Sequence, residues 1–161
     1  FAREDAAIGY TAGLTSVTIP QAVTAIQSYA FYHTAIAEVT VPASVKTWGK
    51  YVFSGCAKLK TARVACDSIG SFAFTRCTAL SNLTISANCR TFGENMLTYC
   101  ESLKVITYEG TIAQWNAITK PTNWMSSGKY FYNDYLQKVQ CTDGCLEYDP
   151  ENDVWNEVKN G

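Results

Sequence analysis

The chain has little net charge and a single histidine. Its 161 residues carry 13 Lys and Arg against 14 Asp and Glu, a formal net charge of -1, and the histidine is His33. Because no basic block is present, the electrostatic footprint of a nucleic-acid-binding protein is missing, and no nucleic-acid partner is expected. No run of about 18 apolar residues occurs, so this segment is not expected to insert into a membrane. Any export signal or anchor is expected to lie outside it.

Groups suited to catalysis are equally sparse. A Cys-His or Ser-His pair would have to use His33. The following carboxylates are scattered among expected loops and termini: Glu4, Asp5, Glu94, Glu101, Asp149, Glu151 and Asp153. No two of them share a strand face, as glycoside hydrolysis would require. The stretch SSGK at 126–129 lacks the spacing of a phosphate-binding loop. The sequence therefore predicts no catalytic residue, no cofactor and no enzyme activity.

The seven cysteines cannot all be paired within the chain. An odd number leaves at least one thiol free or bridged to another chain, which excludes a full disulfide framework and leaves the compartment undecided. In CTDGC, a three-residue loop with Gly144 in the left-handed conformation would set Cys141 opposite Cys145 and permit a disulfide, whereas a two-residue loop would not. Both the bridge and free thiols stay open. No second Cys or His pair has ligand spacing, so no metal site is predicted.

A repeat of about 22 residues runs through most of the chain. Equivalent apolar residues open each unit, with spacings of 22, 23, 21 and 23: Leu14, Ile36, Leu59, Leu80 and Leu103. A fixed period in this range is typical of a solenoid. The third to sixth residues of each unit alternate as in a half-buried strand, and a glycine marks a later bend in three units. We therefore divide the chain into a partial coil or N-terminal cap (1–13), repeats (14–108) and a C-terminal cap (109–161).

Stacked coils would place equivalent side chains over one another at about 4.8 Å. One expected internal column is Phe31, Phe53, Phe74 and Leu97, and a second is Thr34, Cys56, Cys77 and Cys100. A thiol suits such a place because it is small, readily buried and able to donate to a neighbouring carbonyl. Cys66 and Cys89 are expected to be semi-buried fillers in loops. His33 shares its repeat position with Gly55, Arg76 and Tyr99, which indicates an exposed turn.

Four stretches carry a resemblance to a known family. LTSVTIPQAVTAIQSYAF, IAEVTVPASVKTWGKYVFSGC, LKTARVACDSIGSFAFTRC and LSNLTISANCRTFGENMLTYC resemble the BspA-type leucine-rich repeat of bacterial surface proteins. ITYEGTIAQWNAI and VQCTDG resemble closing segments of members from gut bacteria. The third unit departs from the pattern, with Ala65 in place of proline and a shorter loop. The resemblance implies a curved solenoid displayed extracellularly or at the bacterial cell surface, serving adhesion or protein binding.

The expected fold is an α/β-type repeat solenoid. It would be a right-handed leucine-rich-repeat coil with a parallel β-sheet on one face, short 3-10 or helical turns opposite, and an aromatic C-terminal cap. Apolar residues at Ile112, Trp115 and Ile118 predict a short helix over the last coil. Two turn signals in KVQCTDGCLEYDPENDVWNEV predict a small β-meander. The cap concentrates aromatic residues: Trp115, Trp124, Tyr130, Phe131, Tyr132 and Tyr135.

The outward strand positions are the candidate ligand-binding residues. They are Ser16, Thr18, Glu38, Thr40, Thr61, Arg63, Asn82, Thr84 and Thr107, and Val105 is a further outward position. Five stacked strands would form a ladder about 20 Å wide, which suits a peptide or a protein edge. The alternative is that β-branched hydroxyl residues simply tolerate an exposed strand. Glu38 and Arg63 could also neutralise each other across adjacent coils.

Three functions remain open at this stage. The leading hypothesis is a non-enzymatic, monomeric module for adhesion or protein binding, with a host or matrix protein as one possible ligand on the sheet face. The second is carbohydrate binding through the cap aromatics Trp115, Trp124, Tyr130 or Tyr132. Such residues more often fill a core. The third is a structural spacer of a larger surface protein.

Overall fold

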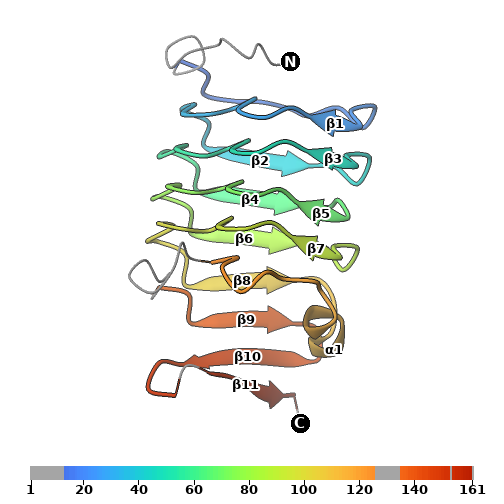
Figure 1. The fold of residues 1–161 in the computed structure, drawn as a ribbon, viewed down its shortest axis with the longest axis vertical. Coiled ribbons are helices and arrows are strands. Elements are labelled where there is room, and N and C mark those ends of the chain that lie inside the picture. The colour runs from blue at the N-terminus through green and yellow to red at the C-terminus, as the bar shows by residue number, and fades with distance from the viewer. Residues whose placement is uncertain (1–12, 126–134, 153, 161) are drawn as a thin grey trace.

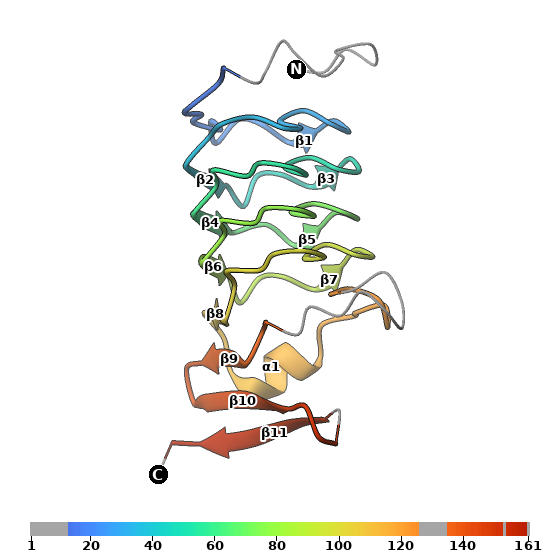
Figure 2. The ribbon, with the colours of Figure 1, turned by 90° about the vertical axis from the view of Figure 1, so that its left-hand side faces the viewer.

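Successive coils of the chain stack along one axis in the computed structural model, which describes residues 13–125, 135–152 and 154–160 (Figure 1). The side view shows the strands of one sheet along one side of the stack and short strands along the other (Figure 2). Predictions for residues 1–12, SSGK, Tyr130, Phe131, Tyr132 and Asp153 fall outside the described residues. The predicted repeat solenoid with a parallel sheet is confirmed.

The main sheet has seven strands in the order β11-β10-β9-β8-β6-β4-β2. Their bounds are β2 (Glu38–Val41), β4 (Thr61–Val64), β6 (Asn82–Ile85), β8 (Val105–Tyr108), β9 (Lys138–Cys141), β10 (Gly144–Asp149) and β11 (Val154–Lys159). The first four begin two residues after the apolar residue that opens each unit. They and β9 are parallel, and β10 and β11 follow as the predicted meander, antiparallel to β9 and to each other.

The opposite layer consists of two-residue strands and tight bends. The strands are β1 (Ala25–Ile26), β3 (Thr47–Trp48), β5 (Ser68–Ile69) and β7 (Thr91–Phe92). Strand β1 pairs with β3 and β5 with β7, both in parallel. At the bends, a Cβ on Gly49 would lie 2.0 Å from the backbone nitrogen of Ser28, and one on Gly93 would lie 2.3 Å from that of Ser71. Glycine therefore lets neighbouring coils approach closely here.

Hydrogen-bonded turns stand where the sequence predicts short helical turns. In each coil the backbone donates to the next coil: Phe31 to Val52, Phe53 to Ala73 and Phe74 to Met96, each at 2.9 Å. A helix would direct these groups along its own axis. Left-handed residues flank the turns instead, at Tyr29, Tyr51, Phe72 and Asn95 and again at His33, Gly55, Arg76 and Tyr99. The coil-to-coil bonds thus add to bonds within each turn, such as Tyr32 to Tyr29 at 3.1 Å and Cys77 to Phe74 at 3.0 Å, which have the three-residue spacing of a 3-10 turn.

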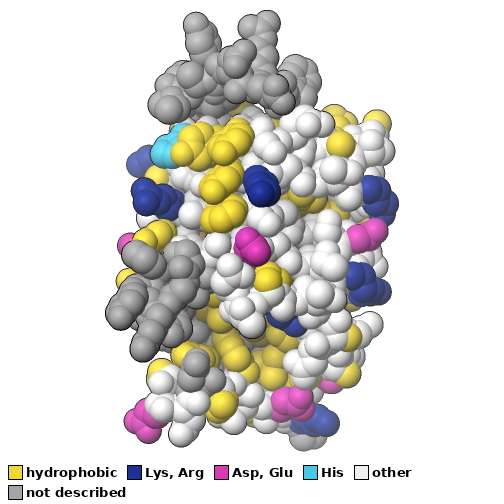
Figure 3. All heavy atoms as spheres, in the orientation of Figure 1, with side chains coloured by type: hydrophobic (Ala, Val, Ile, Leu, Met, Phe, Trp, Pro, Cys, Tyr) yellow, Lys and Arg dark blue, Asp and Glu magenta, His cyan; other side chains and the backbone are white. Residues whose placement is uncertain are grey.

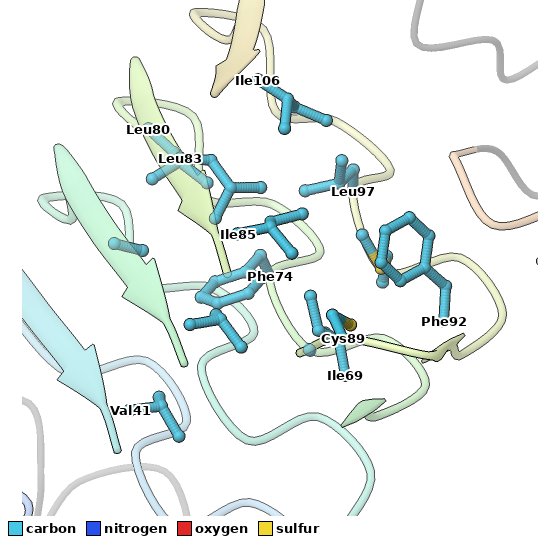
Figure 4. Packing of buried hydrophobic residues seen from close by; sticks show 14 of the residues in the cluster. Val41, Ile69, Phe74, Leu80, Leu83, Ile85, Cys89, Phe92, Leu97 and Ile106 are labelled. Carbon is cyan, nitrogen blue, oxygen red and sulfur yellow. The ribbon is translucent and has the colours of Figure 1, made fainter. Parts of the chain in front are cut away.

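The predicted aromatic column lies in the core, and two of its members, Phe74 and Leu97, are seen between the main sheet and the short strands (Figure 4). Ring centroids of Phe31 and Phe53 are 5.1 Å apart and those of Phe53 and Phe74 are 5.5 Å apart, with ring planes within 7° of parallel. The Trp48 ring contacts the rings of Phe53 and Phe74 in edge-on geometry. Leu97, in the equivalent position of the next coil, is fully buried. One stacked column therefore runs through the repeats.

A column of thiols lies beside the aromatic column. The Sγ atom of Cys56 donates to the Phe31 carbonyl at 3.0 Å, Cys77 to that of Phe53 at 3.1 Å and Cys100 to that of Phe74 at 3.2 Å. The Thr34 hydroxyl lies 3.2 Å from the Cys56 sulfur. Each thiol thus ties its coil to the aromatic column of the coil before. Burial raises the pKa of Cys100 to about 12 and raises that of Cys77 well above its ordinary value.

Cys66 and Cys89 are more deeply buried than expected. Both are fully buried on the side of the short strands, which corrects their prediction as semi-buried fillers. The Trp48 indole N–H donates to the Cys66 sulfur at 3.1 Å. Burial raises the pKa of Cys89 to about 12 and also raises that of Cys66. Each thiol also donates to the carbonyl two residues later, Cys66 to Ser68 at 3.2 Å and Cys89 to Thr91 at 3.7 Å, so the polar S–H group has a partner inside the coil.

The predicted short helix lies over the last coil as α1 (Ile112–Asn116). It begins with a capping box, in which Thr111 and Gln114 each bond the other's backbone N–H. Trp115 is only 4% exposed, and its ring contacts those of Phe92, Tyr108 and Trp124 at 5.3 to 6.0 Å. The helix therefore closes the end of the apolar core, as a solenoid end requires.

The first coil does not form the strand expected of it. Residues 13–24 contain no strand, and β1 is the only strand of this coil. Ser16 and Thr18 therefore do not belong to the ladder, contrary to their prediction as part of five stacked strands. The physical reason is that the sequence pattern specifies only which side chains face inward, whereas a strand also needs backbone partners, and these residues make no backbone hydrogen bond to β2.

We expect the aromatic column to dominate stability. Phe53→Ala should lower the free energy of unfolding by about 3 to 5 kcal/mol, since a fully buried ring leaves a cavity between two stacked neighbours. Tyr29→Ala is the matched control, because that ring is also stacked but is 53% exposed, and it should cost about 1 kcal/mol. Urea unfolding followed by tryptophan fluorescence checks both. Equal losses would contradict the assigned column.

Alkaline pH should destabilise the fold through its buried thiols. In the folded chain Cys89 and Cys100 have pKa values of about 12, against an ordinary value of 9.0. Their contribution is therefore fully present below pH 9 and is lost as pH rises from 9 toward 12, since only the unfolded thiols ionise there. Urea unfolding between about pH 8 and about pH 11 measures the decline. A Cys89→Ala/Cys100→Ala variant should show a shallower one, and an unchanged slope would contradict the assignment.

Candidate functional site

Two rows of side chains project from the outward face of the main sheet. The first is paired residue to residue across five parallel strands: Thr40, Arg63, Thr84, Thr107 and Gln140. The second lies two residues earlier on each strand: Glu38, Thr61, Asn82, Val105 and Lys138. Burial alternates along the four repeat strands, so the residues between the two rows face the core. Tertiary structure therefore brings together every predicted ligand residue except Ser16 and Thr18.

The cap extends this outward face beyond the repeats, which sequence analysis missed. Lys138 and Gln140 continue the two rows on β9, and Glu147 follows on β10. The Lys138 Nζ atom lies 2.8 Å from Glu147 Oε1, which raises the pKa of the lysine and lowers that of the carboxyl. The sequence signal for this extension is the alternation of polar and apolar residues in KVQC, at 138–141. The sequence nevertheless favours a separate meander there, because the chain between β8 and β9 breaks the repeat period.

Arg63 pairs with Glu109 and not with Glu38. Its Nη2 atom lies 2.8 Å from Glu109 Oε2 and 3.0 Å from Oε1. The predicted Glu38 pair is therefore wrong. Glu38 lies opposite Thr61 on the neighbouring strand, two residues before Arg63, whereas Glu109 directly follows β8, so the arginine side chain extends across β6 in the other direction. Both partners are more than a third exposed, so the pair contributes less than about 1 kcal/mol.

A hollow of about 400 Å³ adjoins the β2 end of the face. It combines the hydroxyls of Thr18, Thr40 and Thr61, the charged groups of Glu38 and Arg63, and the apolar side chains of Val17, Ile19 and Val39. Within the described part of the chain, the Glu38 carboxylate makes no ion pair. The hollow therefore offers one unpaired negative charge beside neutral hydroxyls, with an apolar lining. Thr18 contributes here although it is not part of the sheet.

No other described cluster suits metal binding or nucleophilic catalysis. Across residues 13–125, 135–152 and 154–160, no three His, Cys, Asp or Glu side chains lie together as a metal site would need. His33 is exposed, its ring is 4.3 Å from that of Tyr32, and it covers Gly55, where an added Cβ would lie 2.5 Å from the imidazole. On the side drawn in Figure 3, the described basic and acidic side chains are interspersed.

Cys141 and Cys145 are not bridged. Gly144 pairs with Cys141, so the loop between β9 and β10 has two residues and Cys145 lies opposite Gln140. The two sulfurs therefore point to opposite faces of the sheet, and the alternative with free thiols applies. Both loop residues bond to the segment at the start of the helix: the Asp143 carboxylate accepts a hydrogen bond from the Ile112 N–H at 2.8 Å, and the Thr142 backbone N–H donates to the Gly110 carbonyl.

The described cap aromatics serve packing. Trp115 is buried, and Trp124 lies partly buried against Phe92 and Trp115. Tyr135 is exposed, but the Lys104 ammonium lies 4.5 Å from its ring centroid and occupies one face. Stacking of a sugar on Trp115, as the carbohydrate hypothesis requires, is therefore excluded by its burial.

Comparison with known proteins gives the family and the fold. Residues 4–120 match the model of the BspA type leucine rich repeat region in six copies. No curated protein matches this sequence. None of the described helices is long and apolar enough to cross a membrane.

Two solved structures show similar coils. A leucine-rich repeat protein of T. pallidum aligns with a TM-score of 0.60 at 23% identity, over 79% of this chain and 58% of that one. A leucine rich cell surface protein of Faecalibacterium prausnitzii aligns with a TM-score of 0.50 at 27% identity, over 70% of this chain and 35% of that one. The chain thus spans less than two thirds of either relative. With the repeat model matching more than half of its residues, the chain belongs to the BspA-type leucine-rich repeat family.

Proposed function

We propose that this chain is a non-enzymatic, protein-binding module of a bacterial surface protein, and that its ligand binds the outward face of the main sheet. The observation that carries the proposal is the alignment, across five parallel strands, of two rows of outward side chains that end at a hollow. Such a surface is continuous because the strands are in register. Family membership and the likeness to the cell surface protein of Faecalibacterium prausnitzii support a location at the cell surface.

The chemistry of the face favours a protein ligand. The hydroxyls of Thr40, Thr84 and Thr107 offer both donors and acceptors, and the Arg63–Glu109 pair adds charges of both signs. The Gln140 amide adds an acceptor oxygen, since its Nε2 atom already donates to the Cys141 and Gly144 carbonyls. A protein surface presents such mixed groups, whereas a polyanion would require a cationic patch. Five strands span about 20 Å, enough for one protein edge. Adhesion to a host or matrix protein is the specific form of this function that we propose.

A structural spacer is the competing function, and substitution on the face distinguishes the two. We expect Glu38→Ala/Arg63→Ala to weaken binding to a purified extracellular-matrix protein at least tenfold, because the two substitutions remove the charged groups that line the hollow at the β2 end of the face and would leave their ligand partners unpaired. The matched control is Lys46→Ala/Asp67→Ala. It also removes one basic and one acidic exposed side chain, which form an ion pair 3.0 Å long away from the face. That variant should bind normally. Biolayer interferometry against a panel of such proteins measures both.

Two results would contradict the proposal. Equal loss in both variants would place the ligand elsewhere on the molecule. Failure of the unsubstituted chain to bind any member of the panel would favour the spacer. Neither variant should misfold, since both ion pairs are exposed and contribute little to the free energy of unfolding.

A further inference from the structure

The main sheet ends at a strand with a free edge. Strand β2 is terminal in the strand order, and no described segment pairs with its outer side. In a parallel ladder, alternate residues direct both backbone groups to the same neighbour. Ala37 and Val41 accept hydrogen bonds from the backbone N–H groups of the β4 side, at Thr61 and Ala65. The N–H and C=O groups of Glu38 and Thr40 therefore face the open edge, where they are available to an added strand.

The hollow lies alongside this edge and has room for a ligand. Glu38, Val39 and Thr40 form one wall, and Val17, Thr18 and Ile19 form the facing wall. Its volume of about 400 Å³ falls within the range of ligand-binding sites. The facing segment has the apolar alternation of a repeat strand but makes no backbone hydrogen bond to β2. Among the described residues, the edge thus has no backbone partner beside this space.

Charge and polarity specify the kind of side chain that fits. Arg63 is held by hydrogen-bonded contacts to both carboxylate oxygens of Glu109, so the Glu38 carboxylate is the unpaired charge of the hollow. Glu38 projects outward, while Val39, 4% exposed, faces the core beside the apolar Ile19. An added strand would therefore place a basic side chain outward against Glu38, and apolar side chains on either side of it inward.

We propose that the hollow binds an extended peptide segment of a protein ligand by strand addition to β2, with a Lys or Arg side chain of that segment paired with Glu38. This rests on the proposed protein-binding function and specifies its mode. Backbone bonds to Glu38 and Thr40 supply most of the affinity, and the Glu38 pair selects basic over acidic segments. The hydroxyl rows farther along the face then contact the remainder of the ligand.

A short peptide tests this mode directly. The probe is a fluorescein-labelled, terminally blocked peptide of sequence Thr-Val-Lys-Val-Thr, followed by fluorescence anisotropy. Thr40→Pro should abolish its binding, because proline removes the N–H that faces the open edge and breaks no bond to β4. Thr40→Val, which keeps that N–H, is the matched control and should bind normally. Glu38→Gln should weaken binding about two- to fivefold, as loss of one exposed cross-strand charge pair predicts.

Three outcomes would overturn the proposal. One is undiminished binding by Thr40→Pro, and another is equal binding of a probe with Glu in place of Lys. The third is self-association of the chain that Thr40→Pro abolishes, which would make a second copy the occupant. These results are separable from the proposed function: if Thr40→Pro still binds matrix protein while Glu38→Ala/Arg63→Ala does not, the face binds protein without strand addition.

Discussion

The structure depends on backbone hydrogen bonds between successive coils. In the main sheet these bonds form the parallel ladder, and in the opposite layer N–H groups of one turn donate to carbonyls of the next. Because both sides of each coil are tied to its neighbour, the axial spacing is nearly constant around the coil. Equivalent residues of successive coils therefore stack on one another. This arrangement favours residues whose side chains pack well against a copy of themselves.

The stacked interior explains the composition of the repeats. Phenylalanine rings lie nearly parallel, and each thiol of the adjacent column donates to a carbonyl of the coil before it. A larger or more polar residue in the place of Cys77 would clash or leave a group without a partner. Among the left-handed turn positions, Tyr29, His33 and Arg76 are exposed, whereas Asn95 is buried and Gly55 is buried beneath His33.

The same stacking produces the candidate binding surface. Outward residues carry little of the fold's stability, so they are free to differ from coil to coil while remaining in register. The β2 end differs from the rest of the ladder in its backbone, because N–H and C=O groups of this outermost repeat strand have no partner among the described residues. A uniform face and an unpaired edge are thus two consequences of one geometry, and the proposed peptide segment and larger ligand would use them together.

Residue spacing alone was enough to predict the period, the inward and outward positions, the two interior columns and the capping of the last coil. Each of these follows from a short local pattern that recurs in every coil. Three features depend on contacts between distant segments: Arg63 pairs with Glu109, 46 residues away, the loop before Gly144 has two residues, and residues 13–24 form no sheet strand. Those outcomes depend on side-chain reach and on backbone partners brought from distant parts of the chain, which a local pattern does not encode.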